Sequence, residues 1–173
     1  MPSSTFHLPP LLAVIALGSN LGDSREIISE AMVRLARMSN QPAMKSSLWQ
    51  TSPVDCPPGS APFVNAAVAL VPFADETPES LLKKLRALEK KSGRGTKTVP
   101  NEPRVLDLDL IAFGGAIRNT PVLVLPHPRA HLRRFVLQPL SEITPNLILP
   151  GQSQTVAQLL AGLPEAETVM RLE

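Results

Sequence analysis

Apolar and polar residues follow one another in blocks that predict alternating strands and helices. An apolar run over residues 11–17, closed by Gly18-Ser19-Asn20, predicts a buried strand near the start of the chain. Asp23, with Glu26 three residues later, is typical of a helix N-terminus. Apolar residues then recur at helical spacing, so we predict a first helix whose core face carries Ile27, Ile28, Ala31, Met32, Leu35 and Met38.

The centre of the chain predicts two strands around a proline-rich loop, followed by a second helix. Residues 43–51 indicate a weak strand, and residues 63–73 a stronger one. The segment 52–62 between them holds four prolines and one glycine, which disfavour both helix and strand. Thr77-Pro78 begins a helix that ends at Gly93. On this helix we expect Glu79 to pair with Lys83, one turn further on.

The last third predicts one long strand, one extended segment and two helices. These are residues 105–113, 121–126, 129–140 and 156–163 in that order. The resulting order, β-α-β-β-α-β with helix added at the end, predicts an α+β fold, a ferredoxin-like sandwich in which helices pack on an antiparallel sheet. We expect residues 1–10 to be a flexible lead-in and residues 11–173 to form a single domain.

Composition narrows the function classes. Hydrophobic residues make up 43% of the 173 positions, enough for a core, whereas a net charge of +2 and 3% aromatic residues disfavour a nucleic-acid binder. The single cysteine, Cys56, excludes an intrachain disulfide. The apolar run near the start is short and follows Pro9-Pro10 without a basic residue, unlike a signal peptide. We therefore expect a cytoplasmic monomer with no membrane or nucleic-acid partner.

The clearest chemical motif is a pair of acids on the predicted strand 105–113. Because side chains alternate along a strand, Asp107 and Asp109 share one face, while Leu106, Leu108 and Leu110 point into the core. Adjacent carboxylates repel each other unless a cation lies between them, and Mg²⁺ suits such a pair. Taken alone, the motif is equally compatible with an amphipathic strand whose polar face meets solvent.

Basic residues near this pair favour a phosphate ligand. Arg94 and Arg104 flank the segment before the strand, and Arg133 and Arg134 follow His127 on the predicted helix 129–140. Arginine binds phosphate oxygens in a bidentate manner, and metal ions with arginines are the usual equipment of phosphoryl transfer. Taken singly, each arginine is better explained as a surface charge, and His127 as a turn or core histidine. The chain has neither a P-loop nor a G-x-G-x-x-G motif.

A third group of residues could hold a flat heterocycle. Phe63 begins a predicted strand and Phe135 follows the arginine pair, so two aromatic faces are available. Asn65 shares a strand face with Phe63, and its amide offers donors and an acceptor to a ring edge. For each of these residues alone, an ordinary core role is the stronger interpretation.

In order along the chain, these pieces resemble the family of 6-hydroxymethyl-7,8-dihydropterin pyrophosphokinases, from the first strand to about Pro150. The matching segments are 16–23, 51–54, 63–66, 89–94, 103–110, 126–129 and 133–137. The resemblance implies a ferredoxin-like fold and a role in folate biosynthesis. It also implies a reaction in which the substrate hydroxyl attacks the β-phosphorus of ATP and AMP leaves.

The resemblance further implies a role for each matching residue. Asp107 and Asp109 would hold two Mg²⁺ ions on the ATP phosphates, and Arg94 and Arg104 would belong to a mobile catalytic loop. ATP would be bound by Glu89, Leu110, His127 and Arg133. The pterin would be bound by Thr51, Val54, Phe63, Asn65 and Phe135.

Three departures from the family pattern leave alternatives open. Thr96 stands where the family usually has a second loop arginine, Glu102 precedes the Pro-Arg pair, and Arg86 replaces a common glutamine. A lysine at position 97 is a point charge and cannot replace the arginine fork. The alternatives are a relative that binds both substrates but turns over slowly, and a metal-dependent binding module without catalysis.

Overall fold

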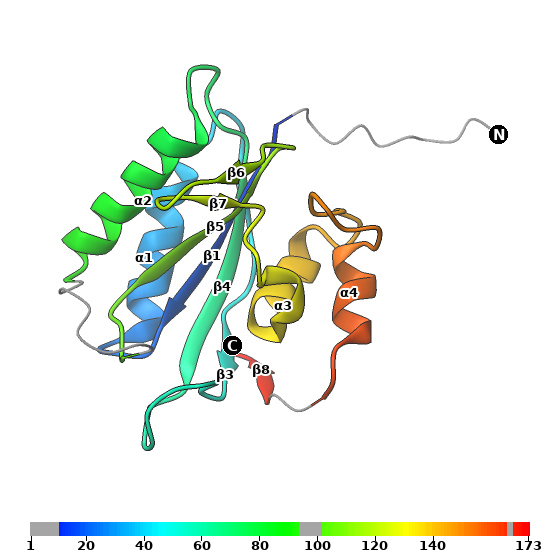
Figure 1. Cartoon of the computed structure of the whole chain (residues 1–173). Helices are drawn as coiled ribbons and strands as arrows, with labels where there is room; N and C mark the ends of the chain where they lie inside the picture. Colours follow the sequence, from blue (N-terminus) through cyan, green and yellow to red (C-terminus); the bar gives the residue numbers. More distant parts are fainter. Residues whose placement is uncertain (1–10, 94–101, 166–167) are drawn as a thin grey trace.

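A computed structural model describes residues 11–93, 102–165 and 168–173, and it shows a sheet between two layers of helices (Figure 1). The long antiparallel strands are β1 (Ala13–Ser19), β4 (Phe63–Leu70) and β5 (Asp107–Phe113), of which β5 lies at one edge. The sheet order is β5-β1-β4-β3-β8, with β3 (Trp49–Thr51) and β8 (Val169–Arg171) on one side and β2 (Met44–Lys45) paired to β4. The predicted α+β sandwich is confirmed.

Helices α1 (Ser24–Ala36) and α2 (Pro78–Lys91) cover one face of the sheet (Figure 1). Asp23 caps α1 by accepting a hydrogen bond from the Glu26 backbone N–H at 3.1 Å, as the pattern predicts. Thr77 caps α2 through a reciprocal pair of bonds with Ser80. The apolar stripes of both helices then meet the strand residues of this face, and fully buried members of that core include Ile15, Ile28, Leu35, Leu81 and Leu85.

Helices α3 (Arg134–Ile143) and α4 (Val156–Gly162) cover the other face (Figure 1). The single helix predicted over 129–140 is wrong, because a 3-10 turn (Ala130–Leu132) is separated from α3 by Arg133 in an extended conformation. In one continuous helix, Arg133 and Arg134 would lie on the face that buries Ala130 and Leu137. Burying two cations there is costly, and with the break in place both arginines are only partly buried.

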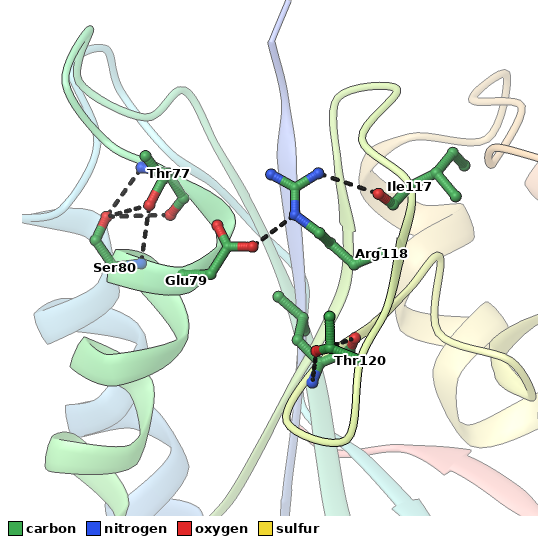
Figure 2. Close-up of polar contacts among 7 residues, drawn as sticks. Thr77, Glu79, Ser80, Ile117, Arg118 and Thr120 are labelled. Atoms are coloured by element: carbon green, nitrogen blue, oxygen red, sulfur yellow. Dashed lines mark hydrogen bonds and ion pairs between the residues drawn. The ribbon is translucent and has the colours of Figure 1, made fainter.

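Of the remaining short strands, one lies within the extended segment predicted over residues 121–126, and the others were not predicted. β6 (Arg118–Asn119) pairs with β7 (Val124–Leu125) in a hairpin, and β8 adds an edge strand where only a helix was predicted for the tail. Strands of two or three residues are too short to show an alternating pattern. Glu79 forms its ion pair with Arg118 of the hairpin (Nε–Oε1 2.5 Å), as Figure 2 shows, and among the described residues no ion pair joins Glu79 to the predicted Lys83.

In the described part of the chain, no helix is long and apolar enough to cross a lipid bilayer.

Candidate functional site

Gly18 joins the two groups of predicted site residues across the sheet. It pairs with Asp107 of β5 on one side and with Asn65 of β4 on the other. Adjacent strands lie about 4.8 Å apart, so the backbones of Asp107 and Asn65 are roughly 10 Å apart. A Cβ atom at Gly18 would lie 3.2 Å from Asn65 Oδ1 and 3.9 Å from Phe63 Cδ1. Only glycine, which has no side chain, therefore leaves the space above this position unfilled.

Asp107 and Asp109 lie on the sheet face that α3 covers, as the alternation predicts. Both are half-buried, whereas the intervening leucines Leu106, Leu108 and Leu110 are at most 4% exposed. The guanidinium of Arg104 forms an ion pair with Asp107 Oδ2, and each side chain is less than a fifth exposed. The buried Arg104 Nε has no hydrogen-bond partner within the described residues. Asp107, the first acid of the pair, is therefore already paired with a cation, the Arg104 guanidinium.

Asn20 fixes the backbone on which Arg104 sits. Its Oδ1 accepts the Arg104 backbone N–H at 2.8 Å, and its own N–H donates to the Arg104 carbonyl at 3.0 Å. Its Nδ2 donates to the Ala61 carbonyl in the proline-rich loop at 3.3 Å. The sequence reasoning assigned Asn20 no role, although a polar residue directly after a buried strand was a usable signal.

Glu89 braces β5 from the opposite layer of helices. Its Oε1 accepts the backbone N–H of Leu108 at 2.8 Å, and the residue is only 5% exposed. Because β5 is an edge strand of the sheet path, this N–H points away from β1. By the same two-residue alternation, Leu110 presents its backbone groups to that outer edge while its side chain lies in the core. Glu89 thus supports the strand that carries both acids.

A β-bulge positions His127 next to the acids. The pairing shifts between Val14 and Ile15, which leaves Ile111 as the extra residue of β5, and its carbonyl accepts the His127 backbone N–H at 2.8 Å. The Arg129 backbone N–H donates to His127 Nδ1 at 3.2 Å. Burial, followed by the charges of Arg133 and Arg129, lowers the pKa of His127 to about 4. The neutral ring therefore carries its proton on Nε2, a donor.

Arg133 lies at the N-cap of α3, within electrostatic reach of both acids. Burial is the main cause that lowers its pKa below the usual value, Arg129 adds to the effect, and Asp109 and Asp107 oppose it. Its Cζ atom lies 5.4 Å from the centre of the Phe135 ring, a cation–π distance. The phosphate-binding candidate and the ring-binding candidate are therefore in contact.

Arg134, in contrast, does not belong to the site. Its Nη2 donates to the carbonyls of Leu163 and Pro164 at 3.0 and 3.2 Å, which ties α3 to the end of α4. Of the two adjacent arginines, Arg134 therefore bonds to the end of α4, whereas Arg133, the one that the family resemblance assigns to ATP, lies near the acids.

Three of the predicted pterin-binding residues, Thr51, Phe63 and Asn65, lie on the strands next to Gly18, on the side away from Asp107. Asn65 Nδ2 donates to Thr51 Oγ1 at 2.7 Å, and both residues are less than 5% exposed. Phe63 lies half-buried on the same strand face. Val54 is 38% exposed in the proline-rich loop, where its carbonyl accepts from Cys56 Sγ at 3.2 Å. Arg94 and Thr96 lie outside the described residues.

The fold and the site define the class of protein. It is an α+β sandwich in which two strand acids, a neutral histidine and arginines are suited to bind a polyphosphate. Beside them lie residues suited to bind a flat ring. A family model, 7,8-dihydro-6-hydroxymethylpterin-pyrophosphokinase (HPPK), matches residues 14–145. The chain belongs to this family, and it is therefore a pyrophosphokinase of folate biosynthesis.

Curated relatives and solved structures agree with this match. The chain is 36% identical to the 2-amino-4-hydroxy-6-hydroxymethyldihydropteridine pyrophosphokinase of Pseudomonas aeruginosa, over 87% of this chain and 90% of that protein. It is 35% identical to the enzyme of the same name from Synechocystis, over 86% and 74%. In fold, it resembles wild-type Plasmodium falciparum HPPK-DHPS with pteroate, with a TM-score of 0.65 and 12% identity. That match covers 88% of this chain but only 44% of the solved chain.

Proposed function

We propose that this chain performs its pyrophosphoryl transfer, from ATP to the hydroxymethyl group of 6-hydroxymethyl-7,8-dihydropterin, across the row formed by Asp107, Gly18 and Asn65. The observation that carries this proposal is the pairing of Gly18 with both other residues. This pairing puts Asp107, one of the two candidate metal-binding acids, and the Asn65 amide, the candidate ring-binding group, on one face, roughly 10 Å apart. That separation leaves room for the reacting phosphate and hydroxyl between them.

The acid pair fits Mg²⁺ by its chemistry. Within the described residues, no three His, Cys, Asp or Glu side chains form a metal-binding group, and Asp107 and Asp109 are the carboxylates that would hold the ions. Mg²⁺ is commonly held by one or two carboxylates together with substrate phosphates and water. When bound, the ions would neutralise charge on the triphosphate. A cation at Asp107 would also compete with Arg104, whose guanidinium would then be available to a phosphate oxygen.

The remaining roles follow from the position of each group. His127 Nε2–H and Arg133 would donate to phosphate oxygens, while the edge of β5 near Leu110 and Glu89 would border the nucleotide. Phe63 and Phe135 would hold the pterin ring, and Asn65 with Thr51 and the backbone near Val54 would bind its edge. The substrate oxygen would attack the β-phosphorus, the bond to the α–β bridging oxygen would break, and AMP would leave.

The test is AMP release from ATP and Mg²⁺ with and without the pterin alcohol, for the natural chain and for Asp107→Ala. We expect pterin-dependent AMP that falls by about 10³-fold in the variant, because the metal supplies several kcal/mol of transition-state stabilisation. Asp75→Ala, an exposed acid in a turn, is the matched control and should retain activity.

Other products would contradict the proposal. ADP in place of AMP, or AMP that forms equally without pterin, would mean another reaction. No AMP despite tight binding of ATP and pterin would mean that the chain is a binding protein on this fold.

A further inference from the structure

Strand β8 lies beyond the residues that the family model matches, yet it completes the sheet beside the candidate pterin wall. In Figure 1 it runs next to β3, close to the C-terminus of the chain. Thr51 of β3 pairs with Val169, and Trp49 pairs with Arg171. This segment, far away in the sequence, therefore borders the residues that would recognise the pterin.

The hydrogen-bond pattern shows which side chains meet across these strands. Ser52 N–H donates to the Thr168 carbonyl at 3.2 Å, and Leu172 N–H donates to the Leu48 carbonyl at 2.8 Å. Because bonded and non-bonded pairs alternate in an antiparallel ladder, Thr51 and Val169 form a non-bonded pair, in which side chains lie closest. Val169 thus covers Thr51 from the side away from Asn65.

The two faces of β8 differ. Val169 is half-buried on the face that α3 covers, which is also the face of the candidate site. Met170 points to the opposite face and is 53% exposed. Thr51 itself is 3% exposed and holds Asn65 through the 2.7 Å bond. Val169 is therefore the residue of β8 whose side chain lies beside Thr51, the hydrogen-bond partner of Asn65.

Glu142 of α3 contacts β3, β8 and the segment just before β3 from the face of the sheet that α3 covers. Its carboxylate accepts from Ser47 N–H at 3.0 Å, Ser47 Oγ at 2.6 Å and Trp49 Nε1 at 3.1 Å, and Arg171 Nη2 lies 3.7 Å away. Burial alone would raise the pKa of Glu142, but the bonds from Ser47 and Trp49 and the Arg171 charge outweigh burial and lower it. The carboxylate thus holds β3 and β8 to α3 as an anion.

We propose that Val169 and Glu142 are positioning residues for the pterin substrate: they hold Thr51, and through it Asn65, at the geometry needed to bind the ring edge. This inference rests on the proposed function of the Thr51 and Asn65 wall. β3 has only three residues and leads into the proline-rich loop, so it depends on its neighbours on both sides. The acids of β5 lie at the other end of the sheet order, which confines the effect to the pterin side.

The experiment compares Val169→Ala with Met170→Ala in the full chain, because the two residues are adjacent on one strand but face opposite ways. We expect Val169→Ala to raise the KM for pterin about tenfold, in line with the apolar area removed. The KM for ATP and kcat should stay within about twofold of the natural values, and Met170→Ala should change none of the three. Glu142→Gln should shift the pterin KM in the same direction as Val169→Ala.

Val169→Ile serves as the conservative variant, because it keeps a β-branched side chain over Thr51 and should retain the natural pterin KM. Equal rises in both KM values, or a loss of thermal stability without a KM split, would reduce Val169 to a structural residue and overturn the proposal. So would natural behaviour of Val169→Ala and Glu142→Gln.

Pterin binding measured by calorimetry with a non-hydrolysable ATP analogue separates the two proposals. If the natural chain releases no AMP but Val169→Ala still weakens pterin binding relative to Met170→Ala, the positioning role holds and the proposed reaction fails. If the natural chain turns over and the two variants bind pterin equally, the reaction holds and the positioning role fails.

Discussion

A glutamate supports each end of the sheet order, Glu89 at the β5 end and Glu142 at the β3–β8 end. The two carboxylates lie in different surroundings. Glu89, from α2, is 5% exposed and accepts the Leu108 backbone N–H in the strand of the acids. Glu142, from α3, is partly exposed and gathers Ser47, Trp49 and Arg171 around β3 and β8. The Glu89 carboxylate supports one long strand from the buried core. The Glu142 carboxylate joins three short segments, those of Ser47, Trp49 and Arg171, at the surface.

This difference separates stability from substrate recognition. A buried acceptor that leaves a backbone N–H without its partner is costly to remove, whereas a solvated cluster can be replaced in part by water. We therefore expect the β5 side to respond to mutation with loss of folding stability and of phosphate chemistry. The β3 side should respond with weaker pterin binding.

The largest effect in this comparison is expected for Glu89→Ala. Removing the carboxylate exposes the Leu108 N–H to an apolar environment and should cost about 1–3 kcal/mol of unfolding free energy. Urea denaturation measures this loss, and Glu89→Gln, which keeps an acceptor, should recover part of it. A Glu89→Ala chain as stable as the natural one would show that the two sides are held equally loosely.

A second prediction tests the glycine between the two sides. In Gly18→Ala the new Cβ would lie 3.2 Å from Asn65 Oδ1, so the amide must shift and strain its bond to Thr51. We expect a pterin KM higher by about fivefold, the equivalent of one hydrogen bond of about 1 kcal/mol. Gly115→Ala, whose Cβ meets nothing within 4 Å, is the matched control. A rise in the KM for ATP alone would place Gly18 on the phosphate side.

A third prediction concerns His127 on the phosphate side. NMR titration of the ring should give a midpoint near pH 4, with the proton on Nε2 above it. Because the folded-state pKa lies below the ordinary histidine value of 6.5, the unfolded chain binds more protons between these values, and stability should fall as pH drops from about 6.5 to about 4. Arg133→Ala should raise the midpoint by removing a nearby cation. A midpoint at or above pH 6.5 would contradict the assignment of His127 as a buried, neutral donor.

The smallest effect is expected for the hairpin contact in Figure 2. Glu79 is fully exposed, and its bond to Arg118, the main cause of its lowered pKa, is open to water and salt. Glu79→Gln should leave the thermal midpoint and the KM for ATP unchanged within error, at low and at high salt. A clear loss in either quantity would mean that this hairpin, and not Glu89 alone, holds the β5 side.

Local patterns in the sequence were enough to predict the main elements and part of the chemistry. Alternation along residues 105–113 predicted that Asp107 and Asp109 share a face, because side-chain direction in a strand depends only on position within it. Capping residues such as Asp23 and Thr77 marked helix starts for a similar reason, since their bonds reach only three residues along the chain.

The tertiary structure decided which distant segments lie side by side. The row from Asp107 through Gly18 to Asn65, and its extension through Trp49 to Arg171, depends on pairing between strands that no local pattern encodes. The extended conformation of Arg133 likewise depends on which residues the sheet must bury. The sequence by itself therefore determined the main elements, the acid pair and the family resemblance, whereas long-range packing decided how the two halves of the site meet and which strand completes the pterin wall.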